Sequence, residues 1–132
     1  MDKKIILDLL KENELSDIEE LQYKDDIIVL RFFYDFDETE IKAAKAFASD
    51  ESGEEEQNEI WTEEFFLPYL TDLAIDNVGE YIEEIMEKAQ VSSQYMSYDL
   101  NAEETEYCEF IAVFYEGEKD IEIETILDEL QL

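Results

Sequence analysis

Residues 27–40 read IIVLRFFYDFDETE, and the interpretation of the whole chain starts from this stretch. Its first ten residues are rich in β-branched and aromatic side chains, which favours a β-strand over 27–36. Alternation makes one face of that strand apolar, whereas the other face carries both apolar and polar side chains. We therefore expect a strand inside a sheet, with one covered face and one face partly in contact with water.

The end of the same stretch predicts the start of a helix. Asp37 and Glu40 have the spacing of a capping box, and the alanines that follow favour a helix over 37–49. A long strand over 38–49 is the alternative interpretation. Asp35 is left without a structural role, and it shares its strand face with Arg31, the only arginine of the chain.

Before this stretch, residues 2–12 predict a helix with Asp2 as its N-cap. Residues 16–23 fit either of two structures. Ser16 and Glu19 could form a capping box for one helical turn, or a strand could start near residue 21.

After this stretch, residues 49–59 predict an acidic loop, and Pro68 suits the first turn of a long helix that runs to about residue 90. Two strand-like segments, 91–100 and 106–116, flank a short polar loop and predict a hairpin. A last helix is expected over 119–130, with Asp120 as its cap.

This order of elements predicts one α+β domain over residues 1–132. We expect an antiparallel sheet of about four strands with helices packed against it. A length of 132 residues matches one domain, and neither repeats nor a linker divides the chain.

The charge of the chain is extreme. Its 39 acidic residues against 9 basic ones give a net charge of −30, so we expect self-repulsion and a stability that rises with salt. The nine cations never cluster, which argues against nucleic-acid binding.

No apolar run is long enough to span a membrane, and a single cysteine, Cys108, suits a reducing compartment, so we expect a cytoplasmic protein.

The amino-acid composition argues against several kinds of active site. The absence of histidine removes the commonest general base and every histidine-ligated metal site. Cys108 is flanked by Glu106 and Glu109, which oppose thiolate formation. Residues 49–59 lack the ligand spacing of a calcium-binding EF-hand loop. We therefore expect no enzymatic activity, no bound metal and no cofactor.

The long helix predicted to start near Pro68 carries a row of acidic residues opposite its apolar side. The row consists of Asp72, Asp76, Glu80, Glu83, Glu84 and Glu87, with Lys88 as the only cation nearby. A solvated face is one interpretation. The functional interpretation is that these residues bind a basic protein, whose cations would relieve the repulsion between them. A third interpretation is that the row binds divalent cations. Such binding would be weak, because a helix face supplies carboxylates but no carbonyl oxygens to complete the coordination of the ion.

Two alternatives to a protein-binding module stay open. Asp35-Phe36-Asp37-Glu38-Thr39 resembles the Asp-x-Asp-x-Thr that opens the active site of many magnesium-dependent phosphoryl-transfer enzymes. The chain is short for that fold and has no later Asp-Asp pair after a strand, so this role for Asp35 and Asp37 is the weaker alternative. The other is a purely structural role, in which a homo-oligomer forms through exposed aromatics such as Trp61 or Tyr69.

Overall fold

Strand β2 (Ile27–Asp35) lies inside a four-stranded antiparallel sheet, as its sequence predicted. The structure is a computed structural model that describes residues 1–132. The sheet order is β1-β2-β4-β3, and the other strands are β1 (Ser16–Leu21), β3 (Ser92–Ser97) and β4 (Tyr107–Tyr115). β3 and β4 form the predicted hairpin, and β2 pairs with β4 along its whole length. The predicted α+β class with about four antiparallel strands is confirmed.

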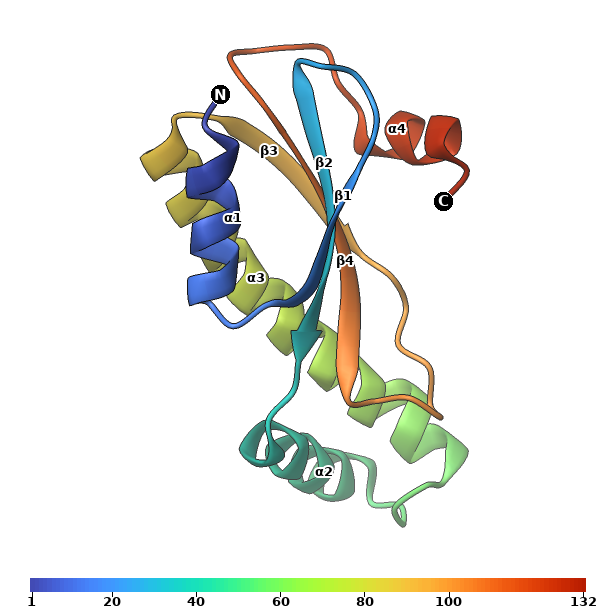
Figure 1. Cartoon of the computed structure of the whole chain (residues 1–132). Coiled ribbons are helices and arrows are strands. Elements are labelled where there is room, and N and C mark those ends of the chain that lie inside the picture. The colour runs from blue at the N-terminus through green and yellow to red at the C-terminus, as the bar shows by residue number, and fades with distance from the viewer.

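Helices cover the two faces of this sheet unequally (Figure 1). The helices are α1 (Lys3–Glu12), α2 (Glu38–Ser52), α3 (Leu67–Ala89) and α4 (Ile123–Leu130). α1 and α3 pack on one face, where Ile28, Leu30 and Phe32 of β2 are buried in the main core. On the other face Val29 packs against Ile126 of α4, which covers only part of the sheet. α2 lies beyond the end of the sheet, beside α3 (Figure 1).

The first two helices begin where the sequence predicted. The Asp2 side chain accepts a hydrogen bond from the Ile5 amide at 3.2 Å and caps α1. Asp37 and Glu40 form the predicted capping box at the start of α2, so residues 38–49 are helix and not strand. α2 continues to Ser52, and Gly53 ends it with a φ of 68°, a left-handed conformation that glycine adopts without strain. The acidic loop is therefore shorter than predicted.

Strand β1 decides between the two interpretations of residues 16–23. Ser16 and Glu19 do not form a capping box, because they pair with Phe33 and Arg31 of β2. The register shifts between these two pairs, and Asp17 has a φ of 49° at this irregularity. Pairing with β2 gives the backbone of this edge strand several hydrogen-bond partners, more than one isolated helical turn would provide.

A π-helical turn, η1 (Trp61–Phe66), leads directly into α3. Pro68 lies in the first turn of α3, as predicted, but this helix continues from η1 and not from a loop. Proline has no amide proton and donates no helical hydrogen bond, which the first turn of a helix tolerates. The Leu67 amide donates to the Thr62 carbonyl five residues earlier, the spacing of a π-helix.

The prediction that Trp61 is exposed was wrong. Its side chain is only 2% exposed and stacks on Phe66, with ring centroids 4.8 Å apart. Its indole Nε1 donates to the Ser49 hydroxyl of α2 at 3.1 Å. Trp61 therefore joins α2 to η1 in a small core that also contains Ala44 and Ala48.

The start of α4 also differs from the prediction. α4 begins at Ile123, and Asp120 does not cap it. The side-chain oxygen of Gln94 on β3 accepts the hydrogen bond of the Ile123 amide at 3.0 Å. A partner from a distant strand thus replaces the local cap, and sequence spacing carries no signal for such a contact.

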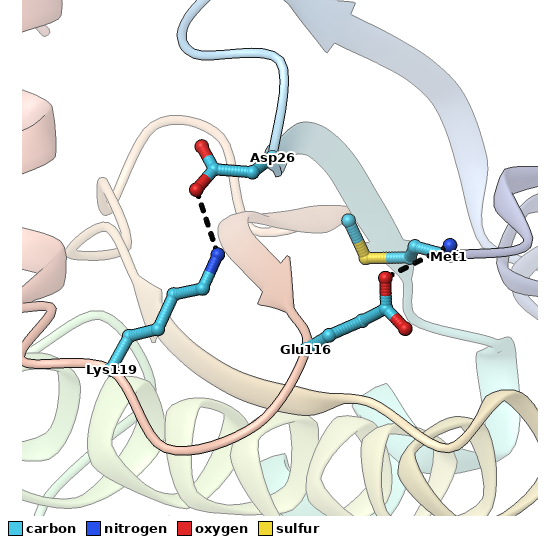
Figure 2. A network of polar contacts seen from close by, with 4 residues as sticks. All are labelled: Met1, Asp26, Glu116 and Lys119. Atoms are coloured by element: carbon cyan, nitrogen blue, oxygen red, sulfur yellow. Dashed lines mark hydrogen bonds and ion pairs between the residues drawn. The ribbon is translucent and has the colours of Figure 1, made fainter.

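Ion pairs hold the loop between β4 and α4 to other parts of the chain, as Figure 2 shows. Lys119 Nζ lies 2.7 Å from Asp26 in the β1–β2 turn, and the amino group of Met1 lies 3.0 Å from Glu116. The hydrogen bond from Lys119 lowers the pKa of Asp26. None of the helices has the length and apolar character needed to cross a membrane.

Candidate functional site

The predicted row of carboxylates lies on the solvent side of α3. We call the row the acidic ridge; its members are Asp72, Asp76, Glu80, Glu83, Glu84 and Glu87, and all are exposed. The opposite side of α3 is buried against the sheet through residues such as Ala74, Val78 and Ile82. Burial of that apolar side fixes the rotation of the helix, so the ridge must face outward.

Cations are scarce on the acidic ridge. Lys88 pairs with Glu84 at 3.8 Å, and no other ridge residue forms an ion pair. Neighbouring like charges on one helix face repel each other by roughly 0.2–0.5 kcal/mol per pair. Summed over the ridge at low salt, the repulsion destabilises the fold by about 1–3 kcal/mol, and salt weakens it.

At its N-terminal end the acidic ridge borders an apolar groove of about 440 Å³ between α2 and α3. The groove is lined by Phe47, Glu64, Phe65, Pro68, Tyr69, Asp72, Leu73 and Asp76. Two of these, Asp72 and Asp76, belong to the ridge. A charged surface and an apolar surface therefore meet at the same place.

Aromatic side chains form the floor of this groove. The Phe47 ring lies 5.1 Å from that of Tyr69 and 6.4 Å from that of Phe65, measured between centroids. Phe47 nevertheless remains 39% exposed. Phe65, Tyr69 and Leu73 follow each other at four-residue spacing, which places them on one helix side. That spacing is a signal that the sequence contained, but the contribution of α2 through Phe47 was not predictable from it.

Asp35 and Asp37 line a second, polar pocket of about 300 Å³ at the end of β2. Its lining residues are Asn13, Glu14, Tyr34, Asp35, Asp37, Glu40, Asn77 and Tyr81. Glu40 accepts a hydrogen bond from the Tyr34 hydroxyl at 2.6 Å, and that hydroxyl accepts one from Asn77 at 2.7 Å. Asp37 is already engaged as the cap of α2, through its bond with the Glu40 amide.

The electrostatics of this polar pocket are negative throughout. Burial and the hydrogen bond to Glu40 raise the pKa of Tyr34. Burial, followed by the charges of Glu40, Glu80 and Glu14, also raises the pKa of Tyr81. No lysine or arginine lines the pocket, so nothing in it offsets the charge of a phosphate. No three acidic side chains in the structure converge in a geometry that could hold a metal ion.

Arg31 does not lie beside Asp35 in an ion pair. Its Nε is 2.5 Å from Glu109 on β4, the residue opposite Phe33 in the sheet. Asp35 remains exposed at the uncovered end of this sheet face and also borders a small hollow with Asp17, Phe33 and Tyr107. It thus has no structural partner of opposite charge.

Cys108 is buried in the main core, with 1% of its surface exposed. Burial and the charge of Glu109 raise the pKa of its thiol to about 11. A thiol with this pKa is almost entirely protonated near neutral pH, so it has little nucleophilic character.

No family model, curated protein or solved structure matches this chain.

Proposed function

We propose that this protein is a binding module without enzymatic activity that docks a basic protein partner through the acidic ridge of α3. The supporting observation is the exposure of all six ridge carboxylates with Lys88 as their only paired cation. The net charge of −30 extends the same negative potential over the rest of the surface. A free, buried thiol suits a reducing compartment such as the cytoplasm.

Binding of a basic partner follows from the energetics of the ridge. Its carboxylates repel each other in the free protein, and lysine or arginine side chains of a partner would relieve that repulsion. A field of one sign also accelerates the encounter with an oppositely charged protein. Both effects weaken as salt is added, because mobile ions screen the charges. The proposed interaction is therefore strongly dependent on ionic strength.

Capture experiments at several salt concentrations test the proposal. The immobilised protein is compared with a ridge variant that carries Asp76→Lys, Glu80→Lys and Glu84→Lys. A control variant carries Glu118→Lys, Glu124→Lys and Asp128→Lys, which changes the net charge equally at exposed positions outside the ridge. We expect basic proteins to bind the native chain and the control variant at low salt, and to be lost from the ridge variant. Equal capture by all three would overturn the proposal.

The weaker candidate is magnesium-dependent phosphoryl transfer with Asp35 and Asp37. It is favoured by one observation, that both side chains line the same pocket. It is opposed by the bond that engages Asp37 with the Glu40 amide. Thermal unfolding with Mg²⁺ separates the two candidates. A rise in melting temperature beyond that of matched ionic strength, abolished by Asp35→Asn, would favour the enzyme over the binding module.

A purely structural role through homo-oligomerisation has less support. Burial of Trp61 removes one of the two aromatic side chains expected at such an interface, although Tyr69 borders the groove. Light scattering at low and high salt tests this role directly. A stable oligomer under both conditions would favour it.

A further inference from the structure

We propose that the apolar groove between α2 and α3 receives the apolar anchor of a basic amphipathic helix, whose cations lie along the acidic ridge. This inference rests on the proposed function and names the kind of segment that the partner presents. It is argued from the composition of the groove, from the charges at its rim and from the length of the ridge.

The groove floor is apolar and open to solvent. The Phe47 ring lies beside those of Phe65 and Tyr69, yet Phe47 keeps 39% of its surface exposed. Phe65 and Tyr69 are half-buried, so the floor still presents apolar surface that a binding partner can cover. A large apolar side chain that enters the groove removes its own surface and the aromatic floor from water together.

The rim of the groove selects the charge of the occupant. Glu64, Asp72 and Asp76 border the groove, and no lysine or arginine does. A second copy of this chain would bring the same carboxylates together, each copy carrying a net charge of −30. An anionic membrane surface would be repelled in the same way. A basic segment has the charge opposite to that of the rim. We therefore expect the partner to carry lysine or arginine residues around the apolar side chain that enters the groove.

The arrangement of groove and ridge favours a helical segment. Asp72 and Glu87 are fifteen residue steps apart on a continuous helix, which at a rise of 1.5 Å per residue gives a surface about 22 Å long. A helix of about the same number of residues covers that length with cations at three- and four-residue spacing. Its apolar anchor then lies near one end, because the groove borders the ridge only at Asp72 and Asp76. Helix-in-groove binding of this kind is a common mode of peptide recognition.

Synthetic peptides test the inference. The probe is a helical peptide of about 16 residues with lysine at every fourth position and one phenylalanine near one end. A second peptide replaces that phenylalanine by serine and keeps all charges. We expect the first peptide to bind at least about tenfold more tightly by calorimetry, because burial of a phenylalanine contributes more than a factor of ten in affinity.

Protein variants localise the effect. Phe47→Ser should abolish the difference between the two peptides, whereas Ile60→Ser should preserve it. Ile60 is a suitable control because it is also exposed, at 46%, and does not line the groove. Circular dichroism of each variant verifies that the fold is intact. The comparison of the two peptides on the native chain requires no variant at all.

The outcomes separate this inference from the proposed function. If the peptides bind equally well, and the ridge variant with three lysines binds neither, the groove inference is overturned while the acidic ridge stands. If neither peptide binds the native chain at low salt, the proposed function fails as well. If light scattering reveals a dimer that Phe47→Ser disperses, the occupant is a second copy and the inference is overturned.

Discussion

Asp37 and Glu40 are joined by two reciprocal hydrogen bonds, one from the Glu40 amide to the Asp37 carboxylate at 2.7 Å and one from the Asp37 amide to the Glu40 carboxylate at 2.9 Å. The second oxygen of Glu40 accepts the hydroxyl proton of Tyr34 at the end of β2. The capping box thus fixes the first turn of α2 and also ties it to the strand that precedes it. This capping role explains the presence of Asp37, the second aspartate of the Asp-x-Asp-x-Thr stretch, without any catalytic function.

The capping role of Asp37 predicts a difference between two variants of equal charge. Asp37→Ala removes the acceptor for the Glu40 amide and should lower the free energy of unfolding by about 0.5–2 kcal/mol. Asp37→Asn retains a good N-cap side chain and should change stability by only about a few tenths of a kcal/mol. Urea unfolding at neutral pH measures both.

Both substitutions remove one negative charge, so a change in net repulsion cannot distinguish them. Equal destabilisation by alanine and asparagine would show that the negative charge of Asp37, and not its capping bond, is what stabilises the fold.

Repulsion along the acidic ridge predicts that neutralising a central member stabilises the fold. Glu80 has three ridge neighbours at three- or four-residue spacing, namely Asp76, Glu83 and Glu84. Glu80→Gln should therefore raise the free energy of unfolding by roughly 0.6–1.5 kcal/mol at low salt, since glutamine and glutamate have similar helix propensity. The gain should fade at high salt, because screening already weakens the same repulsion.

Asp72→Asn is the matched control at the end of the ridge, where Asp76 is the only ridge neighbour at that spacing. Its gain should be about a third of that of Glu80→Gln at low salt. Unfolding curves across a range of sodium chloride concentrations provide the comparison. A gain for Glu80→Gln that is independent of salt would mean that electrostatics is not its cause.

Local patterns in the sequence predicted much of this fold. The β-branched and aromatic residues of 27–36 identified the internal strand, and the spacing of Asp37 and Glu40 identified the start of α2. These signals are local, because they depend on neighbours within one strand or one helical turn. The exposure of the acidic ridge also followed from one helix alone, since its apolar side had to be buried.

Features that depend on distant contacts were not predictable. The Ile123 amide finds its acceptor on Gln94 in another element, so Asp120 is not needed as a cap. Ser16 and Glu19 have the spacing of a capping box, but pairing with β2 outweighs it. The groove requires Phe47 and Tyr69, which come together only when α2 packs beside α3. Local spacing cannot report such contacts, because they are set by tertiary packing.

Burial of Cys108 predicts both its reactivity and a pH dependence of stability. The pKa of its thiol is about 11 in the folded protein, above the ordinary value of 9.0. The folded state therefore holds this proton more tightly than the unfolded state. Its contribution to stability is fully present below about pH 9 and is lost as the pH rises towards about 11. Urea unfolding over this range should show stability falling with pH.

Cys108→Ala isolates this contribution, because every other titrating group is retained. The variant should be less stable by a constant amount from its cavity, and its stability should fall less steeply above about pH 9. A thiol reagent at neutral pH should label the native chain slowly and the urea-unfolded chain rapidly. Parallel pH profiles for the two proteins, or fast labelling of the folded one, would contradict the burial of this thiol.

Gly79 of α3 and Tyr95 of β3 predict a coupled pair of substitutions. A Cβ atom at position 79 would lie 2.7 Å from the Tyr95 hydroxyl but 3.7 Å from the ring carbon that carries it. Gly79→Ala gains helix stability of about 1 kcal/mol, and the displaced hydroxyl offsets part of that gain in the native background. In a Tyr95→Phe background the clash is absent, so the full gain should appear.

A double-mutant cycle measures this coupling from urea unfolding of the native chain, the two single variants and the double variant. Stabilisation by Gly79→Ala should be larger with phenylalanine at position 95 than with tyrosine. The sign of the coupling is decided by one hydroxyl group, because the ring itself remains at ordinary contact distance. If alanine gave the same gain in both backgrounds, the Tyr95 hydroxyl would not be what opposes a side chain at position 79. The contact between α3 and β3 would then adjust to the added methyl group without a loss of stability.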